Sequence, residues 1–294
     1  MASLVSTDDL TDADLHAIVD RGVAFASGEA RGAAPLDGKI VGIYFRMTST
    51  RTRTAFSSGA LRLGGRIITF GPDDLQTGTG ESIEDTGEVL GRMLDAVVCR
   101  TGRPQQELVD WAALRRMSVV NAMTAEEHPT QALADITTLR HRFGELRGLR
   151  VLYVGEGNNT AAALAKTMPR FGIDLELRTP PGYGLGTDVA ARSPGTERHD
   201  MDDLPRDVDV VYTTRWQTTG TSKPDPLWRR DFEPFQVTGQ LMKHSPDAVF
   251  MHDLPAHRGD EVTAEVLDGP ASIVLTQAEH KMHSAMAVLE WCCR

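Results

Sequence analysis

The chain has 294 residues and a formal net charge of −10, with 40% apolar and 24% charged residues. This acidic balance argues against a dedicated nucleic-acid binder, because such a protein must neutralise backbone phosphates. No apolar run approaches the roughly 20 residues that a membrane helix needs, and the length favours two domains with a core each.

The first half of the chain alternates apolar strands with helices. A helix is predicted at 11–25, because Leu15, Ile18, Val19 and Phe25 recur at helical spacing. Strands are then predicted at 39–45, 66–70, 96–99 and 119–123, and helices at 54–63, 82–94, 105–114 and 129–143. A glycine-rich loop occupies 71–80. This alternation is typical of a parallel sheet covered on both faces.

A second alternating block begins with an apolar run at 149–154. Further strands are predicted at 174–178, 208–213, 248–252 and 272–275, with a loop at 179–198 and a closing helix at 278–291. We therefore predict an α/β fold of two doubly wound parallel-sheet domains joined by helices. The predicted domains span 1–136 and 137–275, and we expect the C-terminal helix, within 276–294, to pack back on the first.

The sequence Ser-Thr-Arg-Thr-Arg at 49–53 lies between a predicted strand and a predicted helix. Backbone N–H groups at a helix N-terminus lack partners within the helix, and the helix dipole favours an anion there. Hydroxyl groups and the forked guanidinium of Arg51 add further donors for a phosphate. The alternative is a polar helix cap with solvated arginines.

Two further motifs follow predicted strands. His128-Pro129-Thr130-Gln131 begins a helix, so that the His128 ring and the Gln131 amide can face the same side. The segment 252–258, His-Asp-Leu-Pro-Ala-His-Arg, comes at a strand end, where parallel sheets bind ligands. A Leu-Pro turn there can fix the direction of a backbone carbonyl, for instance through a cis bond. The alternatives are a simple helix cap and an ordinary turn.

These three motifs, in this order and spacing, resemble the aspartate/ornithine carbamoyltransferase family over nearly the whole chain. The matching stretches are 49–53 (STRTR), 80–86 (GESIEDT), 90–93 (LGRM), 128–135 (HPTQALAD), 254–263 (LPAHRGDEVT) and 277–279 (QAE). The stretch at 254–263 favours the ornithine branch. The resemblance implies transfer of a carbamoyl group from carbamoyl phosphate to the amine of an amino-acid-like acceptor.

The resemblance also implies a homotrimer with its active site between the domains and near a subunit boundary. It assigns the phosphate to Ser49, Thr50, Arg51 and Thr52; the carbonyl oxygen to Thr52, Arg100 and His128; and the carbamoyl NH₂ to Gln131 and the Leu254 carbonyl. Lys281 and, across a subunit boundary, Gln76 complete the implied donor site. Donors fixed in advance stabilise the charge that grows on the carbonyl oxygen during amine attack.

The expected acceptor site departs from the family pattern. Thr214 stands where ornithine enzymes have an aspartate, Thr218 and Thr219 replace Ser-Met, and Asp253 replaces a cysteine near the reacting amine. Asn158 and Asn159 match the asparagine that binds the acceptor carboxylate, so we expect an amino-acid head. Lys281 replaces an arginine, which keeps the charge but loses the fork.

From these departures we expect an acceptor other than free ornithine, as in an enzyme of specialised metabolism. Ornithine should then be a poor acceptor, which Thr214→Asp should improve. The alternatives are a genuine ornithine carbamoyltransferase of arginine biosynthesis, a non-catalytic regulatory homologue, and a dinucleotide-binding oxidoreductase. The last rests on Gly155-x-Gly157 alone, which lacks the third glycine of the fingerprint.

We expect no cofactor and no metal site, because the nine histidines do not cluster at ligand spacing. The cysteines, Cys99, Cys292 and Cys293, indicate reduced thiols rather than a disulfide framework. Residues 1–20 are acidic and amphipathic, unlike a secretory signal. These features favour a cytoplasmic enzyme whose partners are small molecules, without nucleic acid or membrane.

Overall fold

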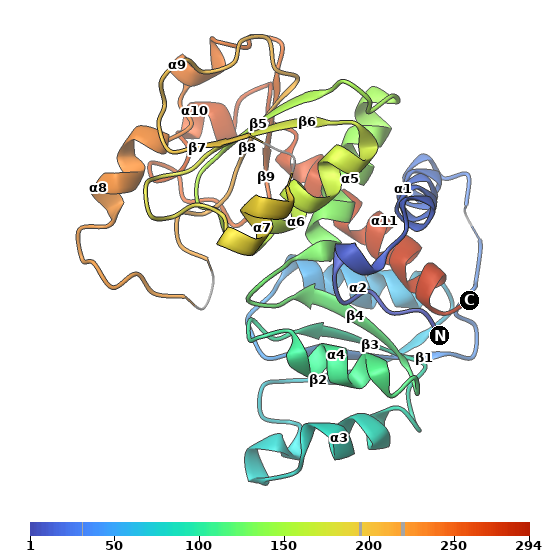
Figure 1. Ribbon diagram of the computed structural model, residues 1–294. Coiled ribbons are helices and arrows are strands. Elements are labelled where there is room, and N and C mark those ends of the chain that lie inside the picture. The colour runs from blue at the N-terminus through green and yellow to red at the C-terminus, as the bar shows by residue number, and fades with distance from the viewer. Residues whose placement is uncertain (31, 194–195, 219–220) are drawn as a thin grey trace. The chain divides into compact units, whose positions relative to one another are not determined.

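The computed structural model describes residues 1–30, 32–193, 196–218 and 221–294. They form two compact units, one of Met1–Arg142 with Glu279–Arg294 and one of Phe143–Ala278. The chain thus passes between units after Arg142 and after Ala278, whereas we expected boundaries after residues 136 and 275. Each unit has its own parallel sheet with helices packed on it, which confirms the predicted fold class (Figure 1).

The first unit is built on a four-stranded sheet in the order β2-β1-β3-β4. Its strands are β1 (Ile40–Phe45), β2 (Arg66–Phe70), β3 (Ala96–Arg100) and β4 (Ser118–Met123). Its helices are η1 (Thr7–Asp9), α1 (Asp12–Ser27), α2 (Arg51–Arg62), η2 (Gln76–Thr79), α3 (Ile83–Leu90), α4 (Gln106–Ala113) and α5 (Pro129–Phe143). All neighbouring strands pair in parallel.

Helices cover both faces of this sheet. Successive side chains of a strand point to opposite faces, so each strand can pack against helices on both. Tyr44 packs against Trp111 of α4, with ring centroids 5.9 Å apart. The next residue, Phe45, lies under the guanidinium of Arg53 in α2, 5.2 Å from its ring centroid. Burial on both faces explains why β1 and β3 are almost continuously apolar.

The second unit has a five-stranded parallel sheet in the order β7-β6-β5-β8-β9. Its strands are β5 (Arg150–Val154), β6 (Asp174–Arg178), β7 (Thr196–Arg198), β8 (Val210–Thr213) and β9 (Val249–His252). Its helices are α6 (Asn159–Thr167), η3 (Met168–Phe171), α7 (Thr187–Arg192), α8 (Arg229–Phe232), η4 (Glu233–Phe235), α9 (Gly239–Met242) and α10 (Ala264–Leu267), and α11 (Val274–Cys292) follows.

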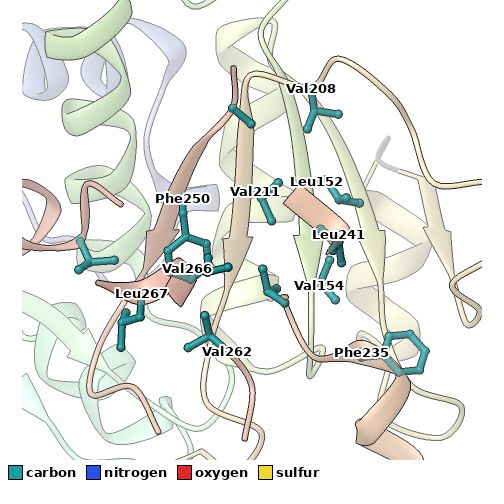
Figure 2. Close-up of a cluster of buried hydrophobic side chains, with 13 residues drawn as sticks. Leu152, Val154, Val208, Val211, Phe235, Leu241, Phe250, Val262, Val266 and Leu267 are labelled. Atoms are coloured by element: carbon teal, nitrogen blue, oxygen red, sulfur yellow. The ribbon is translucent and has the colours of Figure 1, made fainter. Parts of the chain in front are cut away.

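One face of this second sheet is covered by a large apolar cluster. Leu152, Val154, Val211 and Phe250 project from β5, β8 and β9 toward short helical segments (Figure 2). Leu241, Val266 and Leu267 of α9 and α10 complete it. Truncating a buried phenylalanine such as Phe250 to alanine costs about 3–5 kcal/mol, so this cluster fixes the strands whose ends carry polar groups.

Two elements differ from the prediction. The apolar run at 272–275 is not a strand: Ser272 forms only an isolated bridge to Phe250, and α11 begins at Val274. Conversely, β7 lies within the predicted loop at 179–198. It is short and polar, as an edge strand can be, and none of its three residues is fully buried.

The strand order sets where polar groups gather. In each unit the chain reverses its direction across the sheet, between β1 and β3 in the first and between β5 and β8 in the second. Ligands bind at the carboxyl ends of strands beside such a reversal. The three cysteines are free, as expected. Among the described residues, no helix has the length and apolarity to cross a membrane.

Candidate active site

The segment after β1 leads into α2, whose first turn carries the predicted phosphate cradle. Thr50 is the N-cap residue, and its side chain makes no capping hydrogen bond. Thr52 is buried, whereas Thr50 is exposed and Ser49 and Arg51 are half-buried. The start of α2 therefore presents hydroxyl, guanidinium and backbone donors without a side-chain cap of its own. This is the arrangement that binds an anion.

Arg100, the last residue of β3, lies beside His128, which directly precedes α5. The Nη1 atom of Arg100 is 3.4 Å from Nε2 of His128, and Oγ1 of Thr130 is 3.4 Å from Nδ1. A guanidinium can only donate, so this contact requires Nε2 to accept. The structure thus brings together two of the three residues that were predicted to face the carbamoyl oxygen.

Gln131 lies one turn into α5 and is engaged at both ends of its amide. Its oxygen accepts a hydrogen bond from the ammonium of Lys281, and its nitrogen donates to Asp135 across 2.8 Å. All three side chains are buried. The predicted donor-site residues Gln131 and Lys281 are therefore partners of each other in this state.

Gln76 is exposed at the start of the helical turn η2. Its side-chain oxygen accepts a hydrogen bond from the Thr79 hydroxyl across 2.9 Å. An exposed position is compatible with the predicted contact across a subunit boundary, which a single chain does not test.

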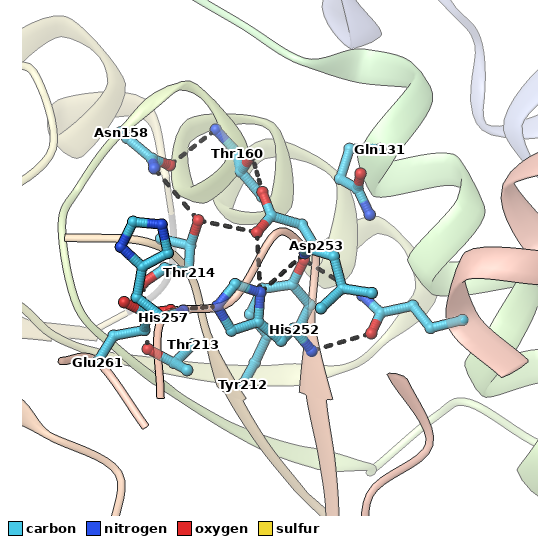
Figure 3. Close-up of polar contacts among 12 residues, drawn as sticks. Gln131, Asn158, Thr160, Tyr212, Thr213, Thr214, His252, Asp253, His257 and Glu261 are labelled. Atoms are coloured by element: carbon cyan, nitrogen blue, oxygen red, sulfur yellow. Dashed lines mark hydrogen bonds and ion pairs between the residues drawn. The ribbon is translucent and has the colours of Figure 1, made fainter. Parts of the chain in front are cut away.

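In the second unit, Asp253 lies just after β9 between two threonines (Figure 3). Thr214 donates to its Oδ1 atom across 3.0 Å, and Thr160 donates to Oδ2 across 3.1 Å. Thr214 follows β8, and Thr160 lies in the first turn of α6 after β5. The carboxylate of Asp253, which follows β9, is thus held by residues that follow two other strands, β8 and β5. Sequence reasoning did not identify Thr160, since nothing local marks it.

The adjacent asparagines have different tasks. Asn158 is the N-cap of α6: its Oδ1 atom accepts from the backbone N–H groups of Thr160 and Ala161, at 2.9 and 3.1 Å. Its Nδ2 atom also reaches Thr214 Oγ1, at 3.5 Å. Asn159 is the first residue of α6 and is buried. The role of this asparagine pair in binding an acceptor carboxylate stays a prediction.

His252 is fully buried beneath Asp253 and Leu254. Its Nδ1 atom accepts from the Leu254 backbone N–H at 2.8 Å, and its Nε2 atom lies 3.1 Å from Glu261. Burial lowers the pKa of His252, and the Asp253 and Glu261 carboxylates outweigh this and raise it overall. The Leu254–Pro255 bond is cis, and Leu254 has a φ of 55°. The hydrogen bond from the Leu254 N–H to His252 holds the backbone at this position.

Thr218 belongs to a second polar cluster, on the segment after Thr214. It donates to Glu156 across 3.1 Å, and Lys223 forms an ion pair with the same carboxylate. The ammonium of Lys223 also lies 4.7, 5.0 and 5.3 Å from the ring centroids of Tyr183, Phe232 and Trp228. Glu156 and Lys223 were not predicted, because 67 residues separate them. Thr219 lies outside the described residues.

No group of three or more histidine, cysteine or acidic side chains in the described part of the chain could hold a metal ion. The third glycine of a dinucleotide fingerprint would fall at position 160, which is a threonine, and Asn158 caps α6.

Comparison with known proteins places both units in one family. The model "Aspartate/ornithine carbamoyltransferase, carbamoyl-P binding domain" matches residues 2–141, and "Aspartate/ornithine carbamoyltransferase, Asp/Orn binding domain" matches residues 147–292. Ornithine carbamoyltransferase from Caldicellulosiruptor saccharolyticus is 38% identical over 100% of this chain and 99% of its own. The anabolic ornithine carbamoyltransferase of Pyrococcus furiosus is 40% identical over 86% and 84%.

Solved structures agree with the sequence comparisons. The crystal structure of ornithine carbamoyltransferase from Thermus thermophilus matches with a TM-score of 0.91 at 32% identity, covering 99% of both chains. The ornithine carbamoyltransferase structure from Pyrococcus furiosus matches with a TM-score of 0.90 at 37% identity, covering 98% of this chain and 96% of that one.

Proposed function

This chain belongs to the aspartate/ornithine carbamoyltransferase family and is a carbamoyltransferase, and on that premise we propose that its acceptor is ornithine. The relatives named above are ornithine carbamoyltransferases. They favour the alternative that the sequence left open over an acceptor other than free ornithine, and nothing in them points to specialised metabolism.

The observation that carries the proposal is the hydrogen bond between Thr214 and Asp253. Taken separately, the two departures remove a carboxylate at position 214 and add one at position 253. The 3.0 Å contact between Thr214 Oγ1 and Asp253 Oδ1 means that the carboxylate remains beside position 214. An acceptor ammonium therefore keeps a charged partner, and charge-assisted hydrogen bonds are roughly twice as strong as neutral ones.

The first unit offers the groups that the donor substrate needs. The start of α2 binds the phosphate, while Arg100 donates toward the carbonyl oxygen and the His128 ring lies beside it. Such preorganised donors stabilise the oxyanion that forms when the amine attacks the carbonyl carbon. Removing one donor of this kind typically slows turnover by roughly 10²–10³-fold.

The reaction needs no covalent intermediate with the protein. The neutral δ-amine of ornithine forms a C–N bond to the carbonyl carbon, and the C–O bond to phosphate then breaks. The proton that the amine loses passes to the departing phosphate, which is itself a base. Positioning the two reactants can supply roughly 7–11 kcal/mol of the reduction in barrier.

An acceptor panel tests ornithine against amines of other chain length and charge. Ornithine should give the highest kcat/KM among ornithine, diaminobutyrate, diaminopropionate, lysine and putrescine.

The test of the proposed reaction is phosphate release together with citrulline formation from carbamoyl phosphate and ornithine. Arg51→Ala should abolish both, because it removes the fork from the phosphate cradle. Arg62→Ala, at the exposed far end of the same helix, is the matched control and should leave turnover unchanged. Near-normal transfer by Arg51→Ala would refute the assignment of the cradle.

We also propose the homotrimer that the resemblance implies, with Gln76 near the subunit boundary. Light scattering after size-exclusion chromatography should give three times the mass of 32.1 kDa for one chain. A monomer with full activity would contradict this proposal.

A further inference from the structure

Glu127, the residue directly before His128, has a carboxylate that is held by the start of the chain. It is 1% exposed. Its Oε2 atom accepts a hydrogen bond from the Ser6 hydroxyl at 2.6 Å. Its Oε1 atom accepts from the Thr7 hydroxyl at 2.6 Å and from the Thr7 backbone N–H at 2.8 Å. Burying a carboxylate costs free energy unless such donors surround it.

The N-terminal segment is itself firmly placed. Leu4 pairs in parallel with Val120 of β4, through hydrogen bonds of 2.8 Å to the Val119 carbonyl and 2.7 Å from the Asn121 N–H. Ser6 is then the N-cap of η1, in a capping box with Asp9. The two hydroxyls that meet Glu127 are therefore fixed from both sides.

The loop between β4 and α5 is held from a second direction as well. The Met123 carbonyl accepts from the backbone N–H groups of Thr101 and Gly102, at 3.0 and 3.2 Å, just beyond Arg100. Within the loop, the Thr124 N–H donates to the Glu127 carbonyl at 3.0 Å. One side of the loop is thus tied to the Arg100 strand and the other to the N-terminal segment.

We propose, resting on the proposed function, that Ser6, Thr7 and Glu127 are positioning residues for carbamoyl transfer. They hold the loop so that the His128 ring stays beside Arg100 and faces the carbamoyl oxygen. Without the two hydroxyls, the buried carboxylate loses two of its donors, and the loop must move to satisfy it. Displacing a catalytic group by about 1 Å can cost roughly a hundredfold in rate.

The test compares Ser6→Ala, Thr7→Val and the double variant with wild-type protein. The double variant should lower kcat by roughly ten- to a hundredfold, while KM for ornithine stays within about twofold. The titration midpoint of the His128 ring, followed by NMR, should shift in the same variant. Ser6→Thr keeps a hydroxyl and should retain most of the activity.

Ser3→Ala is the matched control within the same segment. The Ser3 hydroxyl accepts from the Val119 N–H at 3.0 Å and belongs to the edge of β4 rather than to the Glu127 contact. This variant should cost some stability and leave kcat and the His128 titration at wild-type values. Equal kcat values and equal His128 titrations in Ser3→Ala and the double variant would overturn the proposal.

Two outcomes separate this proposal from the proposed function. If the wild-type enzyme transferred the carbamoyl group to no acceptor, the proposed function would fail. The positioning role would be refuted separately, by an unchanged His128 titration in the variants. If the double variant does not fold, Ser6→Ala takes its place, because it keeps both hydrogen bonds from Thr7. Its kcat and His128 titration are then compared with those of Ser3→Ala.

Discussion

The ammonium of Lys281 donates to the amide oxygen of Gln131, joining α11 to α5 within the first unit. This bond occupies the oxygen that the resemblance assigns to the carbamoyl NH₂. The Gln131 amide nitrogen donates to Asp135, so the side chain cannot simply flip without losing a partner. Lys281 therefore holds Gln131 in place and keeps a positive charge beside it.

Replacing Lys281 with methionine should weaken the binding of carbamoyl phosphate. The substitution keeps all but the last atom of the side-chain length and removes the charge of a residue that is only 8% exposed. A hydrogen bond to a charged group is worth about 1.5–3 kcal/mol, which corresponds to roughly a tenfold or greater rise in KM. Lys281→Arg, which keeps the charge and adds a fork, should stay close to wild type in steady-state kinetics. Equal KM values for Lys281→Met and wild type would remove Lys281 from the site.

A double-mutant cycle at Thr214 and Asp253 tests whether one carboxylate has moved between the two positions. Thr214→Asp alone places two carboxylates within hydrogen-bond distance and should lower kcat/KM for ornithine, because like charges repel. The contact thus reverses our expectation, drawn from the sequence, that this variant improves ornithine use. Asp253→Cys alone should lower kcat/KM too, and the double variant should recover activity. Additive effects, with a coupling free energy below about 0.5 kcal/mol, would mean that the positions act independently.

Gly157→Ala should disrupt the acceptor half of the site. A Cβ atom at Gly157 would lie 2.3 Å from backbone atoms of both Gly184 and Leu185, so the loop that carries Asn158 must shift. We expect KM for ornithine to rise at least roughly tenfold, since small displacements at a binding site are costly. Gly186→Ala is the control, because a Cβ atom there meets nothing within 4 Å. Similar KM values for ornithine in the two variants would show that the close approach of Gly157 to the backbone of Gly184 and Leu185 is not needed for acceptor binding.

The stability of the protein should fall in mild acid because of His280. Burial of its ring, aided by neighbouring His283 and His141, lowers the pKa of His280 to about 4 from its usual 6.5. Between pH 6.5 and 4 the unfolded chain takes up a proton there that the folded chain does not, so stability is lost as pH falls through this window. The loss at the acid end is on the order of 3 kcal/mol.

His280→Leu should flatten that part of the pH dependence in urea unfolding. The Nε2 atom of His280 has no hydrogen-bond partner among the described residues, and Nδ1 lies 3.1 Å from Nδ1 of the half-buried His283, so an apolar replacement removes that single hydrogen bond. His16→Gln, at a half-buried histidine of α1, is the control and should keep the wild-type slope. An unchanged slope in His280→Leu would assign the acid sensitivity to other groups.

The strands that carry the fold could be predicted because burial on both faces makes them continuous apolar runs, as in β3 and β5. The same signal led to the wrong prediction of a strand at 272–275. A short apolar run fits a buried helix end equally well, and here α11 begins at Val274. The edge strand β7 could not be found by this signal, because Thr196–Arg198 is polar.

Part of the site was predictable where the family resemblance assigns several residues to one role. Arg100 and His128 were expected together and lie together. Contacts between distant segments were not predictable: Ser6 and Glu127 are 121 residues apart, and Thr160 and Asp253 are 93 apart. Thr214 and Asp253 were both identified, but their separate interpretation pointed to a changed acceptor. Only their contact indicates that one substitution offsets the other.

The first unit is assembled from both ends of the chain, since Glu279–Arg294 joins Met1–Arg142. Its last residues are tied to its first helix and its sheet: Trp291 donates to Asp14, Glu290 pairs with Arg21, and Ser118 donates to the Cys292 carbonyl. During translation, the ribosome has therefore released the whole second unit before the first can close. Premature termination within Glu279–Arg294 leaves a finished second unit attached to an unfinished first one.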